Sequence, residues 1–250
     1  MVMVSSVEKA MLGRTSPRSN DNFRTQFMGE DRHKGERPDP TVASPIAYLV
    51  EQAPHSELRA HFHEADQFQI FVNGEGRIGG HGAAPGKGHF VGPFSGYGPI
   101  VAGDKGLAYM TFRNAFDPGL QFLPENIEKL RARRSSRREV MFQAPPPVSD
   151  SALDSLREMN VVPLVAQQPD GLAAWSYLLA PGASATGPET TTGGGQFWLV
   201  MAGQMMDAAE GALLRLSMTF VRPGDAPYVV EAGPMGLHVL VLQFPEFRAT

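Results

Sequence analysis

Two histidines separated by one residue are the feature of this sequence best suited to chemistry. His61 and His63 lie in HFHEADQFQIFVNG, where Gln67 follows after three intervening residues and Gly74 after six more. Side chains alternate between the two faces of a β-strand, so both imidazoles point the same way, and Gln67 shares a face of the next strand with Gln69. Neutral imidazole is the commonest protein ligand of transition metals. The pattern therefore predicts a metal or ligand site.

This arrangement resembles the first motif of the cupin superfamily, HxH followed at these intervals by Glu and Gly. Here Gln67 takes the place of the glutamate, which removes one negative charge from the site. The second cupin motif, PxGxxH, normally supplies a further histidine, but the segment from Pro93 to Pro99 has proline in the histidine's place. The resemblance implies a divalent transition metal (Fe, Mn, Ni or Zn), with its occupancy left open, at the ligands His61, His63 and Gln67.

Other polar residues near the motif are candidates for the rest of the site. Gln67 has an alternative role, because an amide could instead bind substrate or orient a histidine from outside the metal. No catalytic residue can be singled out. The residues expected to bind substrate or replace the missing histidine are Gln69, Tyr97, His81 and His89.

Two strand-rich regions of the sequence repeat one another. Gln67 recurs as Gln196 after 129 residues, and Tyr48-Leu49 recurs as Tyr177-Leu178 at the same offset. A repeat of this length implies two tandem domains. In the second copy Thr190 and Thr192 occupy the histidine positions. Threonine binds transition metals poorly, so this copy is expected to be metal-free and structural.

Composition and the resemblance together predict the architecture. The 250 residues include 27 glycines and 21 prolines, which suit many short strands and tight turns. The expected fold class is all-β, with two tandem cupin-type jelly-roll β-barrels joined by a short helical linker. The expected segments are an extended N-terminal arm (1–42), a first cupin domain (43–123), a helical Arg- and Pro-rich linker (124–150) and a degenerate second cupin domain (151–250).

Charge and cysteine content exclude several function classes. The sequence has no cysteine, which rules out disulfides, thiolate metal ligands and a thiol nucleophile. The net charge of −4 provides no general attraction for nucleic acid or membrane. The basic cluster Arg131–Arg138 is interpreted as a solvated linker helix. We expect a cytoplasmic protein whose partner is a small-molecule substrate, and the barrel fold allows a homodimer.

Two functions follow from these features. The first is a metal-dependent bicupin enzyme acting on a small organic molecule in the N-terminal barrel, by dioxygenase-like or related decarboxylase or isomerase chemistry. This expectation comes from the resemblance, since bicupins include such enzymes. The second is a non-catalytic bicupin that binds a small molecule or has a structural role, without a tightly held metal. The first function is the leading hypothesis and the second the alternative, which the missing histidine and the neutral Gln67 support.

Overall fold

The structure is a computed structural model, and it describes residues 2–15, 22–29, 39, 42–133, 137–145 and 148–247. The described chain is mostly antiparallel β-sheet and divides into two compact units. We call residues 13–143 the N-terminal unit, and residues 144–250 together with 1–12 the C-terminal unit. This all-β architecture of two jelly-roll units is the predicted one.

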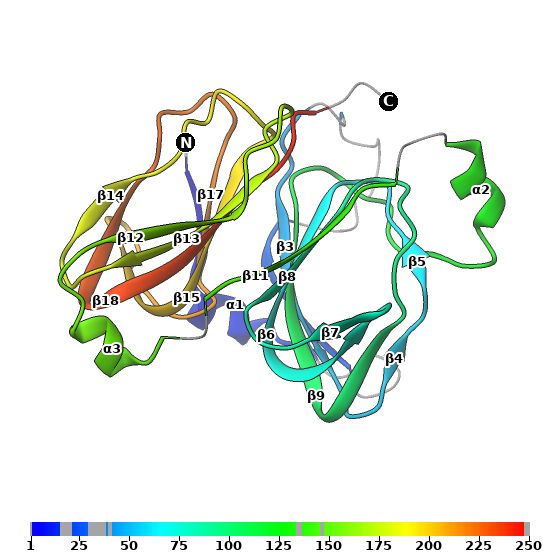
Figure 1. Ribbon diagram of the computed structural model, residues 1–250, viewed down its shortest axis with the longest axis horizontal. Helices are drawn as coiled ribbons and strands as arrows, with labels where there is room; N and C mark the ends of the chain where they lie inside the picture. Colours follow the sequence, from blue (N-terminus) through cyan, green and yellow to red (C-terminus); the bar gives the residue numbers. More distant parts are fainter. Residues whose placement is uncertain are drawn as a thin grey trace. The chain divides into compact units, whose positions relative to one another are not determined.

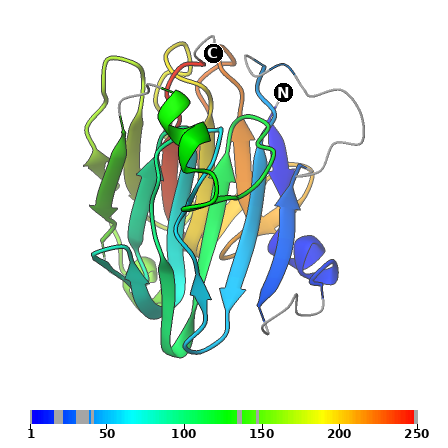
Figure 2. The ribbon, with the colours of Figure 1, turned by 90° about the vertical axis from the view of Figure 1, so that its right-hand side faces the viewer.

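The N-terminal unit is built around one eight-stranded sheet in the order β11-β8-β6-β9-β3-β2, with β4 beside β9 and β7 beside β6 (Figures 1 and 2). Strands β5 and β10 form a separate pair, and helix α2 (Ile127–Ala132) follows them. The strands are β2 (Phe23–Met28), β3 (Ile46–Gln52), β4 (Glu57–Leu58), β5 (His61–Phe62), β6 (Gln67–Ile78), β7 (His81–Ala83), β8 (Lys87–Val91), β9 (Ile100–Arg113), β10 (Gln121–Phe122) and β11 (Glu139–Gln143).

The C-terminal unit repeats this plan in the order β1-β17-β15-β18-β13-β12, with β14 beside β18 and β16 beside β15. Its two short helices are α1 (Val7–Leu12) and α3 (Asp150–Asp154). The strands are β1 (Met3–Ser5), β12 (Asn160–Val165), β13 (Ala173–Leu179), β14 (Ser184–Thr186), β15 (Gln196–Asp207), β16 (Gly211–Leu213), β17 (Met218–Val221) and β18 (Val229–Gln243).

The repeated glycines of the two units have the same structural cause. Gly74 and Gly203 both adopt a positive φ, of 71° and 72°. A Cβ atom on Gly74 would collide with the carbonyl oxygen of Gly106, and one on Gly203 with that of Gly236. Only glycine combines this conformation with such a close approach of two backbones. The repeat in the sequence therefore reflects a shared contact between the two longest strands of each unit.

One of the repeat matches is out of register. Tyr48 pairs with Thr111, which in turn pairs with Gln69, whereas Tyr177 pairs with Val239, which pairs with Val200. Trp198, which follows Gln69 by 129 residues, pairs with Val241, and Val241 pairs with Trp175. Trp175 therefore occupies the position of Tyr48, and Tyr177 lies two residues further along the strand. Tyr48-Leu49 and Tyr177-Leu178 are thus identical in sequence but do not occupy equivalent positions in the two sheets.

The expected domain boundaries differ from those of the structure. Within the expected arm 1–42, Met3–Ser5 pairs with β17 in the C-terminal unit, and Phe23–Met28 pairs with β3 in the N-terminal unit. Within the expected linker 124–150, helix α2 is present, but Glu139–Gln143 pairs with β8 and belongs to the N-terminal unit. Edge strands complete the ladder of a neighbouring strand, so they need little apolar patterning of their own and are hard to recognise in a polar sequence.

Parts of the expected arm and linker fall outside the described residues, namely 1, 16–21, 30–38, 40–41, 134–136 and 146–147. The last two include part of the basic cluster and two of the linker prolines. In the described part of the chain, no helix combines the length and the apolar composition that crossing a membrane would require.

Candidate ligand site

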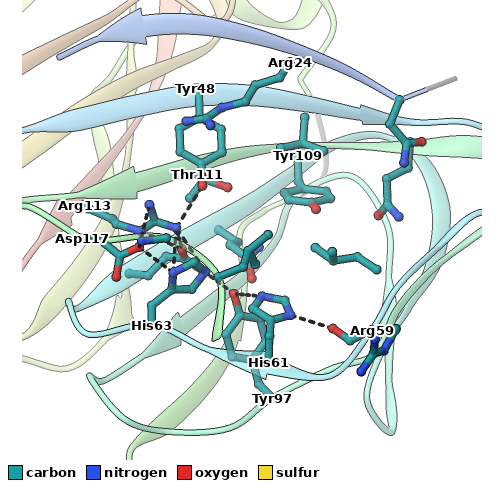
Figure 3. Close-up of a pocket in the computed structure, with 18 of the residues that line it drawn as sticks. Arg24, Tyr48, Arg59, His61, His63, Tyr97, Tyr109, Thr111, Arg113 and Asp117 are labelled. Atoms are coloured by element: carbon teal, nitrogen blue, oxygen red, sulfur yellow. Dashed lines mark hydrogen bonds and ion pairs between the residues drawn. The ribbon is translucent and has the colours of Figure 1, made fainter. Parts of the chain in front are cut away.

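A cavity of about 650 Å³ lies within the N-terminal unit (Figure 3). Three strands supply much of its wall through residues two apart, which share one face of each strand. The wall residues are Tyr48, Val50 and Gln52 of β3, Gln67 and Gln69 of β6, and Tyr109, Thr111 and Arg113 of β9. Strand β6, its neighbour β9 and the next strand of the sheet, β3, thus each place one face around the same space.

His61 is held by hydrogen bonds at both ring nitrogens. Its Nδ1 lies 2.7 Å from the carbonyl oxygen of Arg59, and its Nε2 lies 2.8 Å from the hydroxyl of Tyr97. A carbonyl can only accept, so Nδ1 carries the proton and Nε2 accepts from the Tyr97 hydroxyl. The amide nitrogen of Gln67 donates to that same hydroxyl at 2.7 Å. Gln67 therefore donates to Tyr97, and Tyr97 donates in turn to His61.

Burial keeps the His61 imidazole and the Tyr97 phenol uncharged. It lowers the pKa of His61 to about 3, and the nearby imidazole of His63 acts in the same direction. Burial also raises the pKa of the Tyr97 phenol well above its usual value. Neutral imidazole and neutral phenol are thus the stable forms at physiological pH.

His63 forms a dyad with Asp117. Its Nδ1 lies 2.7 Å from Oδ2 of Asp117, and the backbone amides of Glu64 and Gly119 donate to the same carboxylate at 2.8 and 3.0 Å. Burial lowers the pKa of His63 to about 4, assisted by the positive charge of Arg113. Burial alone would raise the pKa of Asp117, but the hydrogen bond from His63 and the charge of Arg113 lower it to about 2. The dyad is therefore a neutral imidazole beside a carboxylate.

Arg113 links the hydrogen bonds of Gln67, Tyr97 and His61 to the His63–Asp117 dyad. Figure 3 shows it beside His63 and Asp117. Its Nε and Nη2 donate to the side-chain oxygen of Gln67 at 3.0 and 2.6 Å, and Nη2 donates to the Tyr48 hydroxyl at 2.9 Å. Its Nη1 lies 3.4 Å from Asp117 Oδ2. The guanidinium, 2% exposed, is thus the buried cation of the site, compensated by the Asp117 carboxylate.

The guanidinium also covers the His63 ring. Nη2 of Arg113 lies 3.3 Å from Nδ1 and 3.2 Å from Nε2 of His63. Near-equal distances to both ring nitrogens place Nη2 over the ring face, because the same point in the ring plane would collide with the carbon between them. Arg113 therefore stacks on His63 and leaves the in-plane lone pair of Nε2 to other partners.

The residues present do not fit a tightly held divalent metal in this arrangement. His61 Nε2 is occupied by Tyr97 and the Gln67 oxygen by Arg113, while the positive guanidinium stacks on the ring of His63, whose Nε2 lone pair alone is left open. Among the residues that the structure describes, no group of three His, Cys, Asp or Glu side chains is placed to hold a metal ion. A buried cation next to the proposed ligands also repels a second cation.

The structure brings together most of the predicted site residues. His61, His63, Gln67, Gln69 and Tyr97 all line the cavity.

His89 and His81 do not line the cavity. His89 lies behind it, fully buried, with Nδ1 3.0 Å from the Gln69 oxygen and Nε2 3.2 Å from Glu139. His89 is therefore placed to support Gln69 rather than to touch a ligand. His81 is exposed at the start of β7, where it pairs with Ile78 at the turn of the hairpin. The tip of a hairpin extends away from the unit's interior, so His81 is not part of this site.

Several lining residues were not predicted from the sequence. Arg113, Thr111 and Tyr109 alternate along β9, and Tyr48, Val50 and Gln52 alternate along β3. That period-two pattern of polar and aromatic residues in YMTFR was the available signal. Asp117 follows β9 in an irregular segment, so no periodicity pointed to it.

At the matching positions described in the C-terminal unit, the buried polar side chains bond to one another or to the backbone. Gln196 donates to Gln243 at 2.8 Å, and Gln243 donates to the Gly171 carbonyl at 2.6 Å. The Thr190 hydroxyl donates to the Asp225 carbonyl. The interior is a buried apolar cluster that includes Trp198, Val200, Val239 and Val241.

Comparison with known proteins places the fold but not the chemistry. No family model and no curated protein matches the sequence. Among solved structures, a candidate dioxygenase from Nostoc punctiforme matches with a TM-score of 0.64 and 13% identity over 100% of this chain and 85% of that one. The 11S globulin of Wrightia tinctoria, whose structure reveals an auxin binding site, matches with a TM-score of 0.61 and 12% identity over 98% of this chain and 83% of that one.

A third match is the oxalate decarboxylase of Bacillus subtilis, a protein with Mn(II) centres. Its TM-score is 0.60 and its identity 13%, over 100% of this chain and 78% of that one. These neighbours have cupin folds, and each aligns with nearly the whole chain rather than with one unit. The chain therefore has the bicupin fold that the histidine motif and the internal repeat predicted.

Proposed function

We propose that this protein binds a small organic molecule in the cavity of its N-terminal unit, without a tightly held metal ion. The observation that carries the proposal is the place of Arg113. Its guanidinium lies 2.6 Å from the Gln67 oxygen, which a metal would need as a ligand, and places a positive charge directly over the His63 ring. This is the second of the two functions that the sequence allowed.

Electrostatics supports this choice. Two unit charges about 4 Å apart repel by about 4 kcal/mol at an effective dielectric constant of about 20, and a divalent ion doubles that cost. Arg113 is always protonated, so it cannot lower the cost by releasing a proton. A metal could enter only if the guanidinium left its bonds to Gln67 and Tyr48.

The metal-dependent enzyme is the competing proposal. It is supported by the spacing of His61 and His63 and by the cupin folds of the candidate dioxygenase and of the oxalate decarboxylase with its Mn(II) centres. In that case a divalent ion at His61, His63 and Gln67 would supply Lewis-acid or redox chemistry to a bound substrate.

Elemental analysis separates the two proposals. The protein is analysed as purified and after anaerobic incubation with Fe(II), Mn(II), Ni(II) and Zn(II) in turn, followed by gel filtration. We expect far less than one metal per chain, with no further loss in the double variant His61→Ala/His63→Ala. The variant His81→Ala is the control, because that exposed histidine lies outside the cavity.

A content near one metal per chain that disappears in the double variant but not in His81→Ala would overturn the metal-free proposal. It would make the dioxygenase-like or decarboxylase chemistry the leading function. Binding itself is tested by hydrogen exchange, in which a bound ligand should slow exchange in β3 and β9. Those strands carry Gln52, Tyr109 and Thr111 into the cavity.

A further inference from the structure

Gln52, at the end of β3, has a buried side-chain amide that no other described residue hydrogen-bonds. The residue is 5% exposed, and among the described residues neither its Nε2 nor its Oε1 has a hydrogen-bond partner. It lines the cavity described above. A buried polar group without a partner is costly, so such a group in a cavity wall indicates a partner that comes from outside the chain.

Other buried glutamines of the chain show that Gln52 is exceptional. Gln243, 1% exposed, donates to the Gly171 carbonyl and accepts from Gln196. Gln67, also 1% exposed, donates to Tyr97 and accepts from Arg113. Both atoms of each of these amides are used inside the protein, whereas both atoms of Gln52 are left for a ligand.

Two arginines of the cavity wall are paired with carboxylates, and the wall also holds the solvent-exposed carboxylate of Glu57. The Arg113 guanidinium faces the Asp117 carboxylate, and at the rim Arg59 pairs with Glu125 at 2.5 Å. Arg24 stacks on the Tyr48 ring at 3.6 Å and donates to Gln26. Inside the cavity, a charged ligand would have to compete with the Arg113–Asp117 ion pair, whereas an uncharged one would not.

We infer that the ligand of this cavity is an uncharged molecule that presents a hydrogen-bond donor and an acceptor side by side to Gln52, as a carboxamide or a lactam does. This inference rests on the proposed function. A carboxamide and the Gln52 amide can form two parallel hydrogen bonds, N–H to C=O in each direction. A carboxylate offers only acceptors, so it would leave the Gln52 oxygen without a partner and bring an uncompensated charge.

Matched amide and acid pairs test the ligand class. The probes are nicotinamide with nicotinate, and benzamide with benzoate, titrated into the full-length protein and followed by ligand-observed NMR and hydrogen exchange. We expect the amides to bind with dissociation constants of about 1 mM and the acids at least about tenfold more weakly. Exchange should slow in β3 and β9.

The variant Gln52→Leu tests the residue, with Gln243→Leu as its matched control. Gln52→Leu should weaken amide binding at least about tenfold without lowering the melting temperature, because it removes polar atoms that lack a partner. Gln243→Leu should lower the melting temperature and leave amide binding by the folded protein unchanged. A Gln52→Leu variant that melts lower than the wild type would mean that Gln52 is structural, and this would overturn the inference.

The remaining outcomes separate the ligand class from the proposed function. If the acids bind as well as the amides, or if amide binding survives in Gln52→Leu, the inferred class is wrong and the binding function stands. If the amides do not bind while members of a general fragment library slow exchange in β3 and β9, the inferred ligand class is likewise wrong and the binding function stands. If no fragment binds, both the class and the proposed function fail.

Discussion

The two units of this protein use one strand plan to build two different interiors. In the N-terminal unit Gln69 pairs with Thr111, and in the C-terminal unit Trp198 pairs with Val241 at the equivalent place. The next pair along, Phe71 with Tyr109, corresponds to Val200 with Val239. Polar and apolar side chains thus share the wall of a cavity in one unit, while Trp198 and its apolar neighbours pack the equivalent place in the other.

The difference shows that the same strand pairing is compatible with both kinds of interior. Backbone hydrogen bonds hold the sheet in both units, and the glycines at 74 and 203 permit the same close contact in each. Inward-pointing side chains can therefore differ between the two units without changing the sheet, provided that polar ones have hydrogen-bond partners. Both units contain a buried apolar cluster, and the N-terminal unit has in addition a hydrogen-bonded network around Arg113.

The largest expected effect comes from emptying the filled interior. Trp198 is fully buried, so Trp198→Ala should lower the free energy of unfolding of the C-terminal unit by about 3–5 kcal/mol, through lost burial and a new cavity. Gln69→Ala, the equivalent change, should cost about 1 kcal/mol, mainly from its hydrogen bond with His89. Urea denaturation with hydrogen exchange in each unit measures both. Equal losses would show that the two interiors are not different in kind.

Removing one charge from the N-terminal network should have the next largest effect. Asp117→Asn keeps the shape but leaves Arg113 without its compensating charge, and we expect a loss of about 2–3 kcal/mol in the same measurement. Glu125→Gln, which removes the carboxylate of the exposed pair with Arg59, serves as the control and should leave stability unchanged. If Asp117→Asn is also tolerated, the network is not what stabilises this unit.

The buried histidines predict a pH dependence that differs between the units. Burial lowers the pKa of His61 to about 3, of His63 to about 4 and of His238 in the C-terminal unit to about 4, all below the unfolded value of 6.5. Between pH 6.5 and 4 the unfolded chain binds more protons than the folded one. The free energy of unfolding is therefore highest above pH 6.5 and falls as the pH is lowered through this window.

The slope should reach about 1.4 kcal/mol per pH unit for each such histidine. The N-terminal unit, with two, should lose stability about twice as steeply as the C-terminal unit, as measured by hydrogen exchange at several pH values. Asp117, with its pKa lowered to about 2, adds a further loss only below about pH 4. The variant His238→Gln should flatten the profile of the C-terminal unit alone. Equal slopes in the two wild-type units would contradict this comparison.

The smallest expected effect comes from exchanging one hydroxyl between the interiors. Val241→Thr places a hydroxyl among apolar side chains and should cost about 1–3 kcal/mol. Thr111→Val removes a hydroxyl from the cavity wall and should change the free energy of unfolding little. Tryptophan fluorescence reports the first change, since both tryptophans, Trp175 and Trp198, are in the C-terminal unit. A Val241→Thr variant as stable as the wild type would mean that this interior tolerates polar groups as well.

Much of the fold could be predicted because it depends on short-range patterns. The strand containing Gln67 alternates clearly, the turn residues separate the strands, and the repeat implies two units. The strands Met3–Ser5 and Phe23–Met28 could not be predicted in the same way, because they are completed by edges of β17 and β3 that are distant in sequence. Tertiary pairing supplied what local pattern lacked.

The candidate site was predictable in part for the same reason. His61, His63, Gln67 and Gln69 were found because spacing within two adjacent strands places them on shared faces. Arg113 and Asp117 reach the site from β9 and the segment after it, and their roles depend on distances to His63 and Gln67 that no spacing encodes.

The sequence by itself determined that this protein is all-β, that it is a duplication, and that one copy carries two histidines on one strand face. These properties follow from residue types and from side-chain periodicity, which act over a few residues. Only the tertiary structure decided what surrounds those histidines: a buried guanidinium beside the expected metal ligands, and a Gln52 amide that no residue in the described part of the chain satisfies. Such contacts arise where strands far apart in sequence bring their side chains into one cavity, so they depend on the whole fold.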